Sequence, residues 1–325
     1  MRKVWILALL FVVLAAGTWT GKAEANATDE KSIPFADVSG HWAEKEIREL
    51  YIGGALEQED KFRPDDRVTR QELIVMFLRA KGIRPEAKRG SSFADVPADS
   101  WLAPHAETAY RLGIVHGVRS GEKVWLHPQD PVTREEMVSI LVRICGRSGA
   151  VNQLKWSDAI KTLNAYPDGN QVQVSYQRPF AYALKNRLVS AYPDGTLKSG
   201  QLMTRAEAAT YAAIHLLNKR EGKQFLSQPG TLYRQALTVE TTAYSYPPEK
   251  DVLSYLEYPL REGVVAVDPQ VIPLGSHLYI EGYGYAVAAD IGGAVKENHV
   301  DLYLSTVEEA KRHGTQQGVK VYVLD

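Results

Sequence analysis

The sequence predicts a multidomain protein in which an all-helical region of three repeats precedes a small β-barrel. Three observations support this fold class. A Phe-Ala-Asp-Val motif followed by a pair of helical patterns recurs within residues 34–218, and short strand-like runs with Gly and Pro between them begin near residue 236. The length of 325 residues also exceeds what a single ordinary core requires.

Residues 1–27 have the order of a secretory signal. Arg2 and Lys3 precede an apolar stretch at residues 4–16, and A-x-A cleavage sites follow at residues 23–25 and 25–27. A retained membrane anchor is the weaker alternative, because the apolar stretch is shorter than the ~20 residues that span a bilayer. We therefore expect export to the cell surface, with no permanent membrane span after signal cleavage.

The composition excludes some classes of partner and fold. A formal net charge of −1 gives no electrostatic reason to expect nucleic acid as a partner. The single cysteine, Cys145, stands in the apolar run MVSILVRIC, where it is most simply a small core residue. One cysteine cannot form a disulfide within the chain, and an exported protein without disulfides fits a Gram-positive cell envelope.

The repeats are expected at about residues 34–82, 91–146 and 154–218. The first two open with F-A-D-V, a polar turn and a tryptophan, and each continues into two helical patterns. In the third, W-S-D-A at residues 156–159 replaces the opening, and Tyr176 is the aromatic residue nearest to the expected tryptophan position.

Each second helix is preceded by Thr-Arg-x-Glu, at residues 69–72, 133–136 and 204–207. Thr followed three residues later by Glu is the signature of a capping box, which satisfies free N–H groups at a helix start. The cap does not explain the arginines, which are Arg70, Arg134 and Arg205. A cation in the first turn of a helix is disfavoured by the helix dipole, so its presence in all three repeats suggests a function. A guanidinium beside helix N–H groups forms an anion site that can bind a carboxylate.

With these motifs, residues 34–218 resemble three tandem S-layer homology (SLH) domains. The resemblance implies a pseudo-threefold helical bundle that binds secondary cell-wall polysaccharide, often carrying pyruvate ketals, in grooves between the repeats. It also implies that the three arginines pair with the acidic glycan and that Trp42 and Trp101 pack on sugar faces or wall the grooves. The alternative for both tryptophans is a core position at a helix start.

A polar, irregular linker is expected at residues 219–235, and a β-rich domain at residues 236–325. About six strand-like runs in some ninety residues predict a compact barrel. One short helix is expected near residues 305–314, with Ser305 or Thr306 as its cap.

Asp268, Asp290 and Asp301 each stand in an apolar run of this domain, where a carboxylate is costly to bury without a partner. Pro269 and the glycines at residues 292–293 suggest that all three lie at strand ends facing one cleft. Because clustered carboxylates repel one another, we expect a raised pKa for at least one of the three. Glycoside cleavage requires a carboxylic acid that is still protonated near neutral pH, so that it can protonate the leaving oxygen. A metal site made of the three acids is the alternative.

The segments TTAY, GVVAVDPQVIPLGSHLYIEGYG, AADIGGAVKENHVDLYL and VKVYVL resemble the 3D domain, named for its three aspartates, and the catalytic barrel of lytic transglycosylase A-type enzymes. The resemblance implies a double-psi β-barrel that cleaves the MurNAc–GlcNAc bond of peptidoglycan. It implies Asp301 as the general acid and base, with Asp290 and Asp268 as its polarising and orienting partners. The expected substrate contacts are Thr242, Tyr244, Gly292, Gly293 and Lys296.

These features predict a secreted lytic transglycosylase anchored in the cell wall, with peptidoglycan strands and secondary wall polysaccharide as partners and with no cofactor and no metal. Two alternatives remain open at this point. One is a non-catalytic envelope protein that only binds glycan, and the other is a hydrolytic muramidase that uses the same site.

Overall fold

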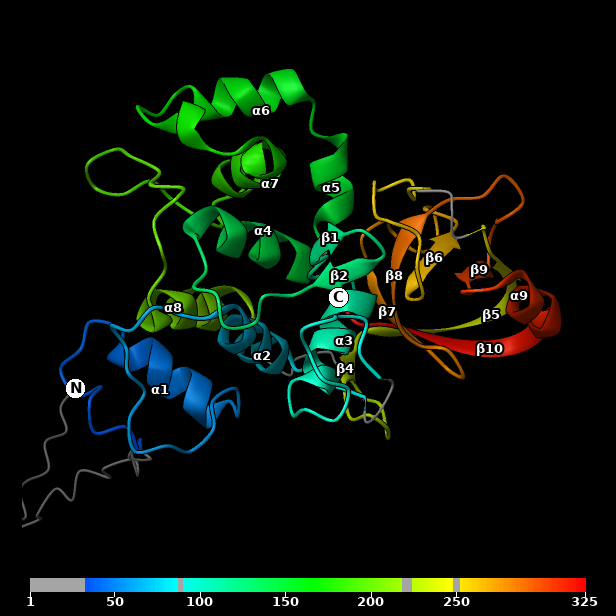
Figure 1. Ribbon diagram of the computed structural model, residues 1–325, viewed down its shortest axis with the longest axis horizontal. Coiled ribbons are helices and arrows are strands. Elements are labelled where there is room, and N and C mark those ends of the chain that lie inside the picture. The colour runs from blue at the N-terminus through cyan, green and yellow to red at the C-terminus, as the bar shows by residue number, and fades with distance from the viewer. Residues whose placement is uncertain (1–32, 87–89, 218–223, 248–251) are drawn as a thin grey trace, which may run out of the picture. The chain divides into compact units, whose positions relative to one another are not determined.

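The computed structural model describes residues 33–86, 90–217, 224–247 and 252–325, and Figure 1 shows their course. The secretory signal expected at residues 1–27 lies outside these residues and stays a prediction. Among the described residues, every helix falls short of the length or the apolarity that a bilayer-spanning segment needs.

The three repeats meet in a ring of backbone hydrogen bonds, formed by the residue that precedes each Thr-Arg-x-Glu motif. The amide of Val68 donates to the carbonyl of Met203 at 3.0 Å, that of Val132 donates to Val68 at 3.0 Å, and that of Met203 donates to Val132 at 2.9 Å. Each extended segment is thus bonded to the next, and the three bonds close the ring.

Three helices begin at this ring: α2 (Arg70–Lys81), α4 (Arg134–Ile144) and α8 (Arg205–His215). In each, the threonine side chain accepts from the glutamate amide, and the glutamate side chain accepts from the threonine amide. This exchange satisfies two N–H groups that a helix start leaves unpaired, so it fixes where each helix begins. The three predicted capping boxes are confirmed.

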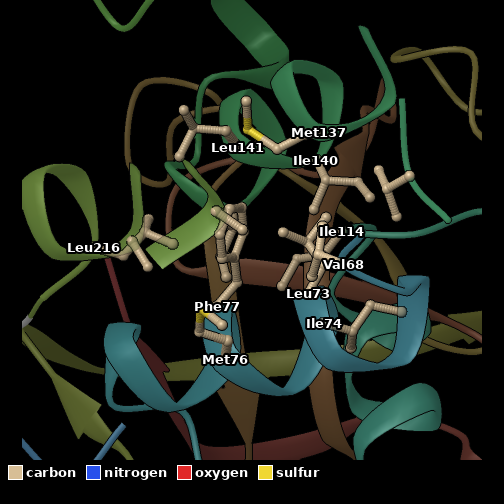
Figure 2. Packing of buried hydrophobic residues seen from close by; sticks show 14 of the residues in the cluster. Val68, Leu73, Ile74, Met76, Phe77, Ile114, Met137, Ile140, Leu141 and Leu216 are labelled. Carbon is tan, nitrogen blue, oxygen red and sulfur yellow. The ribbon is translucent and has the colours of Figure 1, made fainter. Parts of the chain in front are cut away.

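The core of the repeat region lies where these helices face one another. Figure 2 shows Leu73, Met76 and Phe77 of α2 opposite Met137 and Leu141 of α4. All five side chains are at most 4% exposed. Burying a side chain of this size contributes roughly 1.5–3 kcal/mol, so the core outweighs the caps in stabilising the bundle.

An aspartate ties together the loop of each repeat. Asp37, Asp95 and Asp168 each accept hydrogen bonds from two successive amides at 2.7–2.8 Å. The structure therefore moves the opening of the third repeat from residues 156–159 to the turn containing Asp168. Residues 156–159 begin a separate helix, α6 (Trp156–Leu163), on which Asp158 is exposed.

A short hairpin interrupts the second repeat between its two helices, so the region is mainly helical rather than all-helical. Gly121 has a positive φ of 59° and allows the tight turn between the two strands, which are antiparallel. The other elements of the region are α1 (Glu44–Ile52), α3 (Ala103–Arg111), β1 (Val118–Ser120), β2 (Lys123–Trp125), α5 (Ser148–Gln153), a 3-10 turn (Gly169–Gln171) and α7 (Val174–Lys185).

The second part of the chain forms a closed six-stranded barrel with the order β10-β5-β9-β6-β8-β7. Its strands are β5 (Gln235–Tyr244), β6 (Val264–Val267), β7 (His277–Ile280), β8 (Gly284–Asp290), β9 (His299–Tyr303) and β10 (Gln316–Val323). The pairs β5–β9 and β6–β8 are parallel, and the others are antiparallel. The predicted compact barrel is confirmed, as is the short helix α9 (Val307–His313), which Thr306 caps.

The repeats and the barrel belong to one compact unit, Ile33–Asp325. Arg111 of α3 is 2% exposed and reaches into the barrel, where it donates to the carbonyls of Tyr285 at 3.0 Å and Tyr283 at 2.9 Å. Its third hydrogen bond, at 2.9 Å, is to Glu262. Gly263 lies so close that a Cβ there would be 2.7 Å from Cα of Arg111. This contact is therefore as closely packed as a core.

Part of the segment expected as a linker, residues 219–235, is built into the same contact. From residue 224 onward it forms β3 (Gln224–Phe225) and β4 (Leu232–Tyr233), which pair with each other. Leu226, Thr231 and Leu232 are at most 6% exposed, and the Thr231 hydroxyl is hydrogen-bonded to that of Tyr285. The described part of this segment is therefore packed between the repeats and the barrel.

Candidate functional site

Asp301 is held in place by the neighbouring strand. It pairs with Thr242 of β5, whose hydroxyl donates to its Oδ1 at 2.7 Å. Nε2 of His299 lies 2.8 Å from the same hydroxyl. Because a threonine hydroxyl has only one proton to donate, His299 must be the donor in that second bond. Among the described residues, Oδ2 of Asp301 accepts no hydrogen bond, so this oxygen is available to exchange a proton with a substrate.

Asp290 belongs to the same row of residues across the barrel. Ala266 of β6 pairs with Asp301 on one side and with Asp290 on the other. With neighbouring strands about 4.8 Å apart, the Cα atoms of the two aspartates are roughly 10 Å apart. The row thus brings together Asp301 and Asp290, two of the three predicted acids, on strands that are separated by the single strand β6.

Tyr244 of β5 contacts the second of these acids. Its hydroxyl donates to Oδ2 of Asp290 at 3.0 Å, and the amide of Tyr255 donates to Oδ1 at 2.9 Å. Burial raises the pKa of the Tyr244 hydroxyl, and the charges of Asp290 and then Asp301 raise it further. Tyr244 therefore remains a donor. Both oxygens of Asp290 accept hydrogen bonds, whereas one oxygen of Asp301 has no donor within the described part of the chain.

The third aspartate has a different environment. Asp268, which is 9% exposed, accepts from the amides of Gln270 at 3.0 Å and Glu297 at 2.9 Å. These two amides, in that order, lower the pKa of its carboxyl, and the charge of Lys296 adds to them. The raised pKa expected from repulsion is therefore not found at Asp268. Its carboxylate ties the turn after β6 to the loop that follows β8.

We expect Asp268→Asn to destabilise the barrel at neutral pH and to change it little in acid. A carboxyl whose pKa is lower in the folded protein stabilises the fold above its unfolded value of about 3.9, and this contribution is lost as the pH falls below it. Asparagine also turns an NH₂ group toward one of the two amides. Thermal melting should show a lower Tm for the variant at neutral pH and a smaller difference below about pH 3. An equal difference at both pH values would contradict this role.

The loop between β8 and β9 carries the remaining predicted contacts. A Cβ on Gly292 would lie 2.7 Å from Cγ2 of Val295, whereas one on Gly293 would meet nothing within 4 Å. Packing therefore requires a glycine only at Gly292. Lys296 is exposed in the same loop, which begins directly after Asp290.

Two of the three motif arginines join neighbouring repeats. Arg70 donates to Glu136 at 2.9 Å, and Arg205 donates to Glu72 at 2.5 Å. Each glutamate is also the capping residue of a neighbouring helix. Arg70 and Arg205 thus already have carboxylate partners within the protein, and replacing them would disturb the fold as well as any glycan contact.

The third arginine breaks the pattern. Arg134 donates to the carbonyl of Ser190 at 2.6 Å and to the hydroxyl of Tyr211 at 3.0 Å, and it lies over the ring of Tyr192. The hydroxyl of Tyr192 donates to Glu207, the glutamate that would complete the ring of ion pairs. The divergent third repeat has therefore placed a tyrosine where the other two junctions have an ion pair.

The two predicted tryptophans lie at the surface. Trp42 and Trp101 are 62% and 61% exposed, which excludes the alternative of a core position. Trp101 lines a cavity of about 320 Å³, together with Arg205, Lys61 and Arg63. An exposed indole beside cationic groups can contact both the ring and the acidic substituent of a sugar.

Two residues beside Asp301 and Asp290, namely His299 and Tyr255, were not among the predicted site residues. His299 stands two positions before Asp301, so strand alternation places both on one face, and this signal was available in the sequence. Tyr255 contributes its backbone amide, which no side-chain pattern reveals. Among the described residues, no group of three or more His, Cys, Asp and Glu is arranged to hold a metal ion.

Two protein families match the chain. The S-layer homology domain matches residues 34–74, 92–138 and 165–209, and the 3D domain matches residues 263–325. The third S-layer homology match begins just before Asp168, in agreement with the opening that the hydrogen bonds indicate.

Several curated proteins are similar over part of their length. "Exoglucanase XynX" of Acetivibrio thermocellus is 30% identical over 183 residues, which are 55% of this chain and 16% of that protein. "Cell wall-binding protein YocH" of Bacillus subtilis (strain 168) is 52% identical over 62 residues, 19% of this chain and 21% of that protein. The chain thus spans about a fifth or less of the length of these two relatives.

Among solved structures, MltA of Escherichia coli, described as having "a unique lytic transglycosylase fold", is 28% identical. The match covers 24% of this chain and 28% of that chain, with a TM-score of 0.21. The family matches, by contrast, cover both parts of the chain, which is therefore a protein with three S-layer homology domains followed by a 3D domain.

Proposed function

We propose that the protein is a peptidoglycan lytic transglycosylase, held in the cell wall, that cleaves the MurNAc–GlcNAc glycosidic bond. The observation that carries this proposal is the environment of Asp301. One of its oxygens is fixed by Thr242, the other accepts no hydrogen bond from the residues that the structure describes, and a second carboxylate lies in the same row. A protein that only binds glycan does not need such an arrangement.

In the proposed reaction, Asp301 acts first as an acid. Its Oδ2 gives a proton to the oxygen that links the two sugars, and the bond from this oxygen to C1 of MurNAc breaks. The carboxylate of Asp301 then takes the proton of the C6 hydroxyl as the C6 oxygen bonds to C1, which closes a 1,6-anhydro ring. The acid is thereby regenerated, and no water enters the product.

The other residues are assigned to support this sequence of steps. The charge of Asp290, fixed by Tyr244 and Tyr255, stabilises the positive charge that develops on the sugar ring. Thr242 orients Asp301, while Gly293 and Lys296 offer the glycan an open backbone and a cation. We also propose that the strands of the barrel are connected as in a double-psi barrel. The two parallel pairs, β5–β9 and β6–β8, are compatible with this topology.

The repeats are proposed to anchor the exported protein on secondary wall polysaccharide, including pyruvylated forms. The S-layer homology match and the cavity beside Trp101 support this part of the proposal. The exposed Lys61 provides the cationic group of that cavity, because Arg205 is already paired with Glu72 and Arg63 with Glu59.

We expect Trp101→Ala to weaken sedimentation with isolated cell walls without unfolding the repeats, since the side chain is 61% exposed. Truncating a central aromatic contact typically costs about 2 kcal/mol, which corresponds to a roughly 30-fold weaker affinity. Ile214→Ala is the control, because it removes an exposed apolar side chain of α8 away from that cavity. Walls stripped of secondary polymer by acid should retain little of the wild type. Equal retention on stripped walls would refute polymer anchoring.

A glycan-binding protein without catalysis is the second candidate, and the name of YocH, "Cell wall-binding protein", is the observation that favours it. A dye-release assay on purified peptidoglycan separates the two. Release above the level of the Asp301→Asn variant supports the enzyme, and equal values for the two proteins support binding alone.

A further inference from the structure

Two tyrosines beside Asp290 expose their rings to solvent. Tyr246, which follows β5, is 41% exposed, and Tyr255 is 52% exposed. An aromatic ring stabilises a fold mainly through the apolar area that it buries, so a ring left in water contributes little to the core. Exposed apolar side chains that gather beside polar groups are typical of ligand-binding surfaces. The two rings are therefore candidates for contact with a ligand.

Both rings are connected to the carboxylate of Asp290. The hydroxyl of Tyr244 donates to its Oδ2 at 3.0 Å, and the ring of Tyr244 makes an edge-to-face contact with that of Tyr246, with the two centroids 6.1 Å apart. The amide of Tyr255 donates to Oδ1 at 2.9 Å. Each exposed ring is thus linked to a different oxygen of the same acid.

The turn that carries Tyr255 has a fixed backbone. The amide of Ser254 donates to the carbonyl of Tyr258 at 2.8 Å, and the amide of Leu256 donates to the carbonyl of Ala289, in β8, at 3.0 Å. The side chain of Leu256 is 6% exposed and packs in an apolar cluster of the barrel. Both neighbours of Tyr255 are therefore held, and its ring projects from a defined position. A rigid contact of this kind loses little entropy when a ligand binds.

Both tyrosines lie outside the residues that the two families match. The S-layer homology match ends at residue 209, and the 3D match begins at residue 263. Asp290 and Asp301, by contrast, lie inside the 3D match. The two exposed rings thus belong to the segment between β5 and β6 of this chain and do not follow from either family match.

The chemistry of this surface suits the sugar rings of an uncharged glycan. One face of such a ring carries C–H groups, which pack on an aromatic side chain, while the sugar hydroxyls stay in water and the phenol offers a polar edge. The charged group linked to both tyrosines is the carboxylate of Asp290, which repels an anion but not a neutral sugar. Acetylated hexosamine rings meet both conditions.

We propose that Tyr246 and Tyr255 are platforms for N-acetylhexosamine rings and place a β-linked glycan strand along the row of acids. Tyr255 has two roles in this arrangement, because its amide holds Asp290 while its ring holds the sugar. The proposal rests on the function proposed above, since the strand is the one whose bond Asp301 would cleave. Such contacts hold the substrate and the transition state equally, so they set KM and leave kcat nearly unchanged.

Amide NMR spectra of the full chain carrying Asp301→Asn, titrated with chitotetraose, measure binding without turnover. We expect saturable shifts of the Tyr255 amide, with a Kd in the millimolar range typical of a small ligand. Adding Tyr255→Ala, which keeps the amide that holds Asp290, should weaken binding roughly tenfold, and Tyr246→Ala should weaken it likewise. Tyr255→Phe keeps the ring and should bind as the Asp301→Asn protein does. Ile160→Ala, which removes a 44% exposed side chain of α6, is the control.

The kinetics of the otherwise unaltered chain separate a platform from a structural role. On soluble glycan strands, Tyr255→Ala should raise KM about tenfold and change kcat by less than about twofold. A fall in kcat with an unchanged KM would contradict the proposal, because it would mean that the substitution disturbs Asp290 and not the contact with the sugar.

The binding experiment can overturn the proposal in several ways. Chitotetraose that produces no saturable shift, or that binds Tyr255→Ala or Tyr246→Ala as tightly as the Asp301→Asn protein, would exclude the two platforms. A Tyr255→Phe variant as weak as Tyr255→Ala would assign the contact to the hydroxyl and not to the ring. Equal binding of maltotetraose, whose α-linkages curve the strand, would exclude a site for an extended β-linked glycan. Binding of chitotetraose that depends on Tyr255, in a protein whose wild type releases nothing from peptidoglycan, would refute the proposed activity and leave the platforms intact.

Discussion

If the proposed function holds, we expect Asp301→Asn to reduce the release of fragments from purified peptidoglycan to background and to leave the fold unchanged. Asparagine keeps the size of the side chain and still accepts the hydrogen bond from Thr242, but it cannot donate a proton and then recover one. General acid–base groups typically contribute about 10²–10⁴-fold each, and in this protein one group is assigned to both steps. The turbidity of a peptidoglycan suspension, followed over time, measures the loss.

Two matched variants make this test specific. Asp290→Asn should retain more activity than Asp301→Asn, because Asp290 is assigned to stabilise charge and not to transfer the proton. His299→Gln should remain close to the wild type, since glutamine can still donate to Thr242, whereas His299→Leu removes that donor. An active Asp301→Asn beside an inactive Asp290→Asn would transfer the acid–base role to Asp290.

We expect Arg111→Met to lower the free energy of unfolding by about 2–4 kcal/mol. Breaking a buried charge interaction usually costs slightly more, roughly 3–5 kcal/mol. The variant keeps much of the length of the side chain but removes the two hydrogen bonds that Arg111 donates to the carbonyls of Tyr283 and Tyr285. The loss is smaller than usual because the side chain of Glu262, the charged partner, is 42% exposed. Urea denaturation followed by tryptophan fluorescence measures the change.

Glu262→Gln is the control for this second prediction. Because the carboxylate is exposed, its pairing with Arg111 contributes little, and the variant should lose less than about 1 kcal/mol. Equal losses for Arg111→Met and Glu262→Gln would mean that the ion pair, and not the two carbonyl contacts, holds the repeats to the barrel.

Features with a local cause could be predicted from the sequence. Thr69 and Glu72 fix a helix start through contacts three residues apart, and the same holds for the cap of α9 at Thr306. The six strands of the barrel follow from runs of β-branched residues between turns. Strand alternation also places His299 and Asp301 on one face of β9, whereas the pairing of Asp301 with Thr242 joins two strands that are far apart in the sequence.

Features that depend on distant partners could not be predicted. W-S-D-A at residues 156–159 looks like a repeat opening, but the role belongs to Asp168, because only its carboxylate meets the amides of the following loop. The role of Asp268 is set by an amide 29 residues away. Arg111 is one of 38 lysines and arginines, and nothing in its neighbourhood marks it as the residue that enters the barrel.

Mass spectrometry of the fragments that the wild type releases from purified peptidoglycan tests the central claim most directly. If Asp301 serves as acid and then as base toward the C6 hydroxyl, the new MurNAc ends are 1,6-anhydro sugars, each lighter by one water than a reducing end. Fragments with reducing MurNAc ends would contradict this account, because they would show that water, and not the C6 hydroxyl, closes the reaction.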